Sequence, residues 1–295
     1  MKFNRLIIPA VIVCAFSFSM CDYIVDPNEV ATVGPVFDTT KRVALIEEWT
    51  GHTCIACPAA AADIEQLEAA YGQSFVAISI HDDFFAEPCP SPHPTPNCAI
   101  GVPGAFAEDF RCATGASYSA SHVSGPQSPP QGMVNRLGMQ SNTEVKGRGT
   151  WPGLVDSLVQ EDACTSIHID HQYNTSNRQL GVTVRGTWLQ SYTGTINIAI
   201  MLTESGMVGW QTNGTSCDSE FVFENVLREC LNTPGDIAGT QLTTGTTPVG
   251  NVWSYTLPSA YTIPNAFDPA GCTMVAILYD TTTGEVLQAW KEEVQ

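Results

Sequence analysis

The chain has 295 residues, of which 43% are hydrophobic and only 14% are charged. Its 30 acidic residues outnumber its 12 basic ones and give a formal net charge of −18 at pH 7. This charge argues against a nucleic acid or an anionic membrane surface as a partner, because both repel an acidic protein. The length is sufficient for two ordinary domains, each with its own apolar core.

Residues 1–20 have the pattern of a secretory signal peptide. Basic Lys2 and Arg5 precede an apolar stretch over residues 6–16, and small residues follow it. The apolar stretch is too short for a durable membrane span. We therefore expect an extracytoplasmic mature chain, in a compartment where disulfides persist, and the eleven cysteines agree with this expectation.

Two cleavage sites compete at the end of this signal. Residues 17–19 suit an ordinary site with small residues at its ends, whereas residues 18–21 form an imperfect lipobox that would leave Cys21 as a lipidated N-terminus. We favour lipidation, because a cysteine directly after the apolar stretch, followed by a polar tether, suits an anchored protein. The tether is expected over residues 21–40, where prolines interrupt a polar sequence.

A CxxC pair, Cys54 and Cys57, lies between an expected strand over residues 43–50 and an expected helix over residues 59–71. Two thiols at this spacing can close a small disulfide. The unpaired amides at a helix start favour a thiolate on the first of them. Cys54 is therefore the predicted nucleophile, with its sulfur open to solvent, and Cys57 is the predicted resolving thiol.

The rest of the first half alternates between strand and helix. A strand is expected over residues 75–81, then a long loop, a strand near residues 132–135 and a helix over residues 151–160. This alternation predicts an α/β sheet layer over residues 41–161.

The second half, residues 162–295, has a different pattern. Apolar residues alternate with polar ones, as in half-buried strands, and the sequence shows no metal-ligand or nucleophile constellation there. The pattern predicts a small antiparallel β-sandwich. Its strands are expected over residues 165–170, 180–185, 195–200, 252–257, 274–279 and 285–290.

The α/β half resembles a thioredoxin fold, because a CxxC begins its first long helix and a proline pair, Pro129 and Pro130, precedes its third strand. The resemblance implies that Pro130 follows a cis peptide bond and lies opposite the dithiol. A plain turn with a trans bond is the alternative, since most bonds before proline are trans.

A closer resemblance covers nearly the whole mature chain. Several segments are similar to the Bacteroidetes lipoproteins related to outer membrane protein twenty-eight. That family joins a thioredoxin-like domain to an immunoglobulin-like β domain, so the implied fold class is α/β plus all-β and the implied location is the outer membrane, on its periplasmic or surface face. The segments are residues 46–51, 79–81, 132–136, 202–209 and 221–228.

Two acids and two histidines lie near the dithiol in the predicted fold. A buried Glu48 would have a raised pKa and could accept the proton of Cys57, whereas Glu47 is expected to cap a helix or face water. His52 could favour the thiolate, or could simply be exposed on the turn. His81 could line the mouth of the dithiol cleft, or could be an ordinary hydrogen-bonded histidine at a strand end.

The other cysteines are expected to form structural disulfides. Cys89 and Cys98 bracket a proline-rich loop and could close it, which leaves Cys112 as the odd thiol. The four cysteines of the second half allow three connectivities. The most local choice pairs Cys217 with Cys230 and Cys164 with Cys272.

Two function classes follow, neither with a cofactor. The first is thiol-disulfide exchange with protein thiols or disulfides of secreted or envelope proteins, in which Cys54 attacks and Cys57 resolves the mixed disulfide. The second is a non-catalytic binding or structural lipoprotein with a permanent Cys54–Cys57 disulfide. A copper or zinc site with His81 is a minor alternative, because copper chaperones of this fold have three residues between their cysteines and this chain has two.

Overall fold

The computed structural model describes residues 40–82, 84–89, 94–122 and 128–295. The predicted signal peptide, the lipidation site Cys21 and the tether up to residue 39 therefore lie outside the described residues. Among the described residues, no helix is long and apolar enough to cross a membrane.

The first layer is built around two parallel strands, β1 (Ala44–Thr50) and β2 (Phe75–His81). Both strands are buried along nearly their whole length, as expected for parallel strands covered on both faces. Helix α1 (Cys57–Tyr71) connects them, β3 (Gln131–Val134) pairs antiparallel with β1, and β4 (Val145–Gly147) pairs antiparallel with β3. The predicted strands and the predicted helix of this layer are confirmed to within a few residues.

Helices α2 (Ala113–His122) and α3 (Trp151–Leu158) complete the layer. The sequence predicted α3 but placed α2 in a long loop, and that prediction was wrong. Apart from Tyr118, the buried face of α2 is small or polar, so the apolar period that marks most surface helices is missing. The residues of that face are Thr114, Gly115, Tyr118 and His122.

A four-stranded antiparallel sheet lies in the second half. Its central strand β6 (Gln179–Thr187) pairs with β5 (His168–Asn174) on one side and with β12 (Val252–Thr256) and β13 (Tyr261–Thr262) on the other. Alternate residues of β6 are buried, which matches the predicted period of two.

A second group of antiparallel strands is organised around the long strand β7 (Tyr192–Glu204). It pairs with β14 (Cys272–Asp280) and with β11 (Thr240–Thr247), and β15 (Val286–Glu293) pairs with β14. Buried residues of β6 and β7 belong to one hydrophobic cluster, so the two sheets of the second half share a core.

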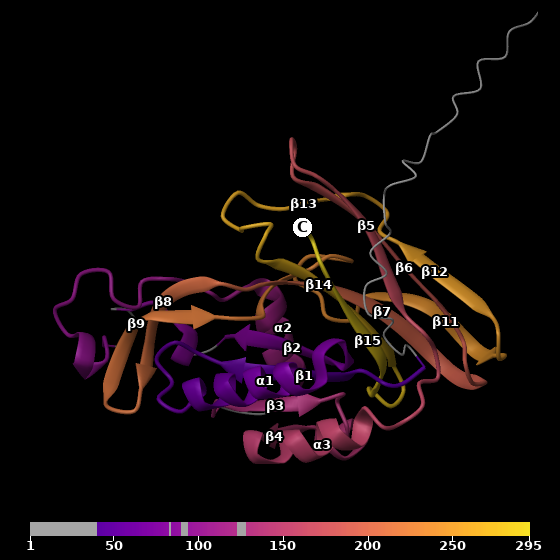
Figure 1. Ribbon diagram of the computed structural model, residues 1–295, viewed down its shortest axis with the longest axis horizontal. Helices are drawn as coiled ribbons and strands as arrows, with labels where there is room; N and C mark the ends of the chain where they lie inside the picture. Colours follow the sequence, from indigo (N-terminus) through magenta and orange to yellow (C-terminus); the bar gives the residue numbers. More distant parts are fainter. Residues whose placement is uncertain (1–39, 83, 90–93, 123–127) are drawn as a thin grey trace, which may run out of the picture. The chain divides into compact units, whose positions relative to one another are not determined.

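Strand β10 (Val226–Cys230) connects the strands of both halves. It pairs in parallel with β2 and antiparallel with β7, so one sheet runs in the order β15-β14-β7-β10-β2-β1-β3-β4. Figure 1 labels the other strands of this sheet. The sequence predicted no strand over residues 207–247, which was wrong. The strands there include β8 (Met207–Asn213) and β9 (Ser216–Phe223), and β9 is exposed along most of its length, so it lacks the alternation of a half-buried strand.

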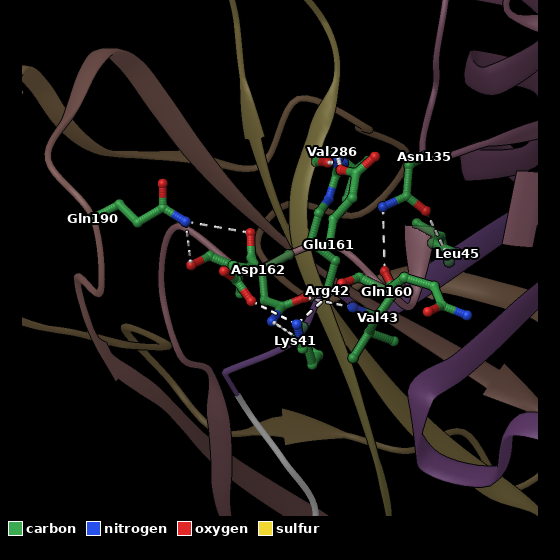
Figure 2. A network of polar contacts seen from close by, with 12 residues as sticks. Lys41, Arg42, Val43, Leu45, Asn135, Gln160, Glu161, Asp162, Gln190 and Val286 are labelled. Carbon is green, nitrogen blue, oxygen red and sulfur yellow. Dashed lines mark hydrogen bonds and ion pairs between the residues drawn. The ribbon is translucent and has the colours of Figure 1, made fainter. Parts of the chain in front are cut away.

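A polar network crosses the predicted domain boundary between residues 161 and 162 (Figure 2). Lys41 Nζ donates to Asp162 Oδ1 at 2.6 Å, and Arg42 donates to Glu161 Oε2 at 2.6 Å and to the carbonyl oxygen of Val286 at 2.7 Å. Exposed ion pairs of this kind contribute little free energy individually. Their effect is positional, because they hold the chain before β1 against the end of α3 and against β15.

Candidate functional site

Cys54 and Cys57 are joined by a disulfide, with their Cα atoms 5.5 Å apart. Helix α1 begins at Cys57, so Cys54 lies in the turn before the helix. Each residue is only 2% exposed. The expectation of a solvent-exposed Cys54 sulfur at the helix start was therefore wrong, because other parts of the chain cover it.

The hairpin of β8 and β9 contacts the backbone of this turn. The Thr212 amide donates to the carbonyl oxygen of His52 at 2.8 Å, and the Gly214 amide donates to that of Ile55 at 3.3 Å. The buried side chain of Gln211 donates to the carbonyl oxygen of Cys54 at 3.0 Å. Three hydrogen bonds from one hairpin thus hold the CxxC turn in place.

Pro129 and Pro130 lie on another side of the disulfide. The peptide bond between them is cis, which confirms the geometry expected at Pro130. The Cys54 sulfur lies 3.5 Å from the carbonyl oxygen of Pro129. The proline segment that the sequence placed beside the dithiol therefore contacts it through Pro129.

The segment after β2 covers a further side of the turn. His52 is fully buried, and its Nε2 atom lies 2.9 Å from the carbonyl oxygen of Glu87, so the alternative in which it is simply exposed on the turn is wrong. The Thr53 amide donates to the carbonyl oxygen of Phe85 at 3.1 Å. A Cβ atom on Gly51 would lie 2.4 Å from that same oxygen, so this close approach requires a glycine.

A second disulfide joins Cys98 to Cys217 on β9, with a Cα separation of 5.6 Å. It excludes the predicted pairs Cys89 with Cys98 and Cys217 with Cys230. Those pairs were chosen for short loops, but tertiary packing brings the short helix η3 (Asn97–Ala99) against β9. Cys89 is instead buried near Phe106, to whose carbonyl oxygen its amide donates at 2.7 Å.

The predicted pairing of Cys164 with Cys272 was also wrong, because neither residue is in a disulfide. The Cys164 carbonyl oxygen accepts from the Leu189 amide, just before β7 begins, whereas Cys272 lies opposite Glu204 at the far end of β7. A strand of 13 residues is roughly 40 Å long, far beyond disulfide reach. Cys112, predicted to be the odd thiol, is likewise outside any disulfide.

Glu48 has the environment that the sequence predicted. It is 2% exposed, and its Oε1 atom has no hydrogen-bond partner among the described residues. Burial, with a smaller contribution from Asp63, raises the pKa of Glu48 to about 8. Glu48 and Cys57 line the same cavity, of about 410 Å³. The proton-relay role itself stays a prediction.

The raised pKa of Glu48 predicts a pH dependence of stability. Between pH 4.5 and about 8 the folded state holds a proton on Glu48 that the unfolded state has lost. The free energy of unfolding should therefore fall as the pH rises through this window, by about 1.4 kcal/mol per pH unit at most. Urea unfolding of the wild type and of Glu48→Gln at several pH values tests this. Equal slopes for the two proteins would contradict it.

Glu47 does not face water as expected. It is fully buried, and its carboxylate accepts hydrogen bonds from Arg136 at 2.6 and 2.9 Å and from Tyr118 at 2.7 Å. Burial opposes ionisation, but Arg136 outweighs it and lowers the pKa of Glu47 below its ordinary value. Arg136 lies in one of the segments that resemble the lipoprotein family, residues 132–136, but the sequence did not indicate that its side chain contacts Glu47.

His81 lines the same cavity as Cys57 and Glu48, as one of the two alternatives predicted. Neither of its ring nitrogens makes a hydrogen bond of ordinary geometry to a described residue, and a weak contact with the Ser79 backbone has only a small effect on its pKa. Burial, with a smaller contribution from His52, lowers its pKa to about 3, so its imidazole is neutral at pH 7. No group of three or more His, Cys, Asp or Glu side chains within the described ranges is arranged to hold a metal ion.

Comparison with known families identifies the chain. Residues 116–295 match the family model described as Outer membrane protein Omp28. The chain belongs to the Omp28 family. The resemblance seen in the sequence is thereby confirmed, and the family makes this an outer-membrane-associated protein. The matched segment includes Pro130 and the β8–β9 hairpin but begins after the Cys54–Cys57 pair.

Two solved structures from Porphyromonas gingivalis are similar to this Omp28-family chain. HBP35 has 13% identity and a TM-score of 0.58, over 86% of this chain and 75% of that one, which shows a shared fold. A domain of the outer membrane lipoprotein Omp28 has 20% identity and a TM-score of 0.27, over 44% of this chain and 88% of that one. No curated protein matches the sequence.

Proposed function

We propose that this Omp28-family chain is a binding lipoprotein of the outer membrane, in which the Cys54–Cys57 disulfide is a protected structural bridge. The observation that carries the proposal is the 2% exposure of both cysteines. The proposal includes export by residues 1–20, a lipid anchor on Cys21 and a tether over residues 21–40.

The fold assignment within this proposal rests on topology. Residues 41–161 have the order β-α-β-α-β-β-α, with β1 and β2 parallel and β3 and β4 antiparallel, which supports a thioredoxin-like domain. Residues 162–295 contain two antiparallel sheets with a common core, which supports an immunoglobulin-like sandwich. β10 adds a strand from this second domain to the sheet of the first.

Burial of the disulfide is the argument against routine exchange. A thiolate must reach a disulfide sulfur to attack it, so exchange depends on access as well as on potential. Here the hairpin, the cis-proline segment and the segment after β2 all contact the turn. An attacking protein thiol would have to displace at least one of them.

A redox titration tests the proposal. We expect the Cys54–Cys57 disulfide to stay oxidised in glutathione buffers poised from about −180 to −300 mV, as structural disulfides do. Alkylation followed by mass spectrometry of the peptide that contains both cysteines provides the measurement. The Cys98–Cys217 peptides serve as an internal comparison. Reduction with a midpoint between about −120 and −270 mV, the range of known oxidoreductases, would overturn the proposal.

Thiol-disulfide exchange is the second candidate, because Cys57 and the buried Glu48 share one cavity. A substrate thiolate would attack the Cys54 sulfur and form a mixed disulfide, while Cys57 leaves as a thiolate that Glu48 can protonate. A second substrate thiolate would then release reduced Cys54 and an oxidised substrate. Exchange is reversible, so in a Cys57→Ser variant the free Cys54 thiolate would attack a substrate disulfide and release one substrate thiolate, and no Cys57 thiol would resolve the mixed disulfide. Accumulation of this mixed disulfide in the native host would favour the candidate.

A further inference from the structure

We propose that the cavity beside Cys57 binds an ammonium group carried on a short aliphatic chain. This inference deepens the proposed binding function, on which it rests, by assigning a ligand class to the cavity. The cavity is about 410 Å³, which lies within the size range of small-molecule sites. Its lining includes Pro58, Ala61 and Glu65 of α1, and residues at the end of β9 and in the turn after it.

The charge of the cavity selects a cation. Its lining includes four glutamates and neither a lysine nor an arginine. One of the four, Glu68, is partly compensated, because Lys291 Nζ lies 3.8 Å from its carboxylate and Asn225 donates to it at 3.1 Å. The other three are Glu65, Glu224, which accepts from the Gly206 amide at 3.2 Å, and Glu48, which is protonated at pH 7 and gains its charge when a bound cation displaces the proton.

Two buried polar groups in the lining lack partners. The Oε1 atom of Glu48 makes no hydrogen bond to any described residue, and the ring nitrogens of His81 make none of ordinary geometry, with only a weak contact to the Ser79 backbone. Buried polar groups in folded proteins are nearly always hydrogen-bonded, so these atoms indicate a ligand, and both the Glu48 oxygen and the unprotonated nitrogen of the neutral His81 ring accept a donor. An ammonium group has three donors, enough for the Glu48 carboxylate and a neutral imidazole together.

The rest of the lining suits an aliphatic chain. Ile64 and Phe223 are buried and apolar, and Phe221 is half-buried. Apolar walls with a few convergent polar groups are typical of small-molecule sites. A hydrated metal ion would leave these walls unused, whereas the methylene groups of an alkylamine would cover them. Two sources share this chemistry, a free diamine and the lysine side chain of another protein.

Calorimetric titration of the full mature chain tests the proposal, with 1,5-diaminopentane and Nα-acetyl-lysine methylamide as probes and neutral 1-pentanol as the control ligand. We expect saturable binding of at least one amine at a single site. Glu48→Gln should weaken it at least about tenfold, because a charged hydrogen bond is lost. Glu65→Gln, which changes an exposed acid of the cavity lining, should weaken amine binding about two- to fivefold. Glu220→Gln, an exposed acid on β9 outside the lining, should leave it unchanged.

The same titration has a pH signature. Glu48 holds a proton in the free protein at pH 7, so a bound cation should release it, and binding should tighten as the pH rises from 6 to 8. Glu48→Gln should abolish the proton release, which is measured from the binding heats in two buffers. Asp63, which forms an ion pair with Arg148, is a charged group near Glu48. The other charged and titratable groups that line the same cavity are Glu65, Glu68, His81 and Glu224.

Each outcome decides the matter. Tighter binding of the lysine derivative identifies a protein side chain as the ligand, and tighter binding of the diamine identifies a free amine; both support the proposal. Absence of saturable binding, equal binding of 1-pentanol, or unchanged binding in both Glu48→Gln and Glu65→Gln would overturn it. The redox titration needs no ligand, so failure of one proposal is distinguishable from failure of the other.

Discussion

Replacing Arg136 with methionine should lower the free energy of unfolding by about 3–5 kcal/mol. The guanidinium of Arg136 and the carboxylate of Glu47 form a pair whose side chains are 3% and 0% exposed. The substitution keeps much of the side-chain volume but leaves the Glu47 carboxylate buried without its counter-charge. The hydrogen bond from Tyr118 would remain and is too weak to replace a full charge. Urea unfolding at pH 7 measures the loss.

The matched control for this prediction is the double variant Glu47→Gln/Arg136→Met. It removes both charges, so we expect it to be more stable than Arg136→Met alone. The pKa of Glu47 is lowered in the folded state, so its contribution is present above pH 4.5 and is lost as the pH falls toward the folded pKa. If the free energy of unfolding of Arg136→Met lay within about 1 kcal/mol of the wild-type value, the Glu47–Arg136 pair would contribute little to stability.

Removing the Cys98–Cys217 disulfide should speed chemical reduction of Cys54–Cys57 by about thirty- to several hundred-fold. This cross-link joins residues separated by 119 positions and holds β9 against η3. A disulfide that closes so long a loop contributes about 2–4 kcal/mol. Because β9 forms a hairpin with β8, and β8 donates to the CxxC turn, loss of the cross-link should make opening of the hairpin easier.

A time course of alkylation in a phosphine reductant measures this effect on a Cys98→Ser/Cys217→Ser variant. Gln211→Ala removes one hydrogen bond to the turn and should speed reduction only about two- to tenfold. Cys164→Ser, which removes a cysteine outside any disulfide, controls for the loss of a thiol. Unchanged rates in both test variants would mean that the hairpin does not limit access to the disulfide.

Several features of the site could be predicted from sequence because they depend on neighbours in the chain. The strand over residues 44–50, the CxxC turn and helix α1 follow one another directly, so local composition was sufficient. The burial of Glu48 follows from its place in an almost wholly buried strand. The cis bond before Pro130 was expected only because the dithiol upstream suggested a particular fold.

The predictions that were wrong concern contacts between distant segments. Glu47 meets Arg136 across 89 positions, and Gln211 meets Cys54 across 157. Pairing cysteines that are close in the sequence gave the wrong disulfides. The entropic free energy gained by closing a short loop instead of a long one is small compared with the packing free energy that positions each cysteine. Helix α2 was missed because its buried face carries small and polar residues that contact β10.

The sequence by itself determined the family, the acidic charge, the strands around the dithiol and the residues that could carry chemistry there. Only the tertiary structure decided whether that dithiol is accessible. The physical reason is that the exposure of Cys54 depends on where the β8–β9 hairpin, more than 150 positions away, packs. The hydrogen bonds between this hairpin and the CxxC turn involve mainly backbone groups, which every residue carries, so the sequence gives no sign of them.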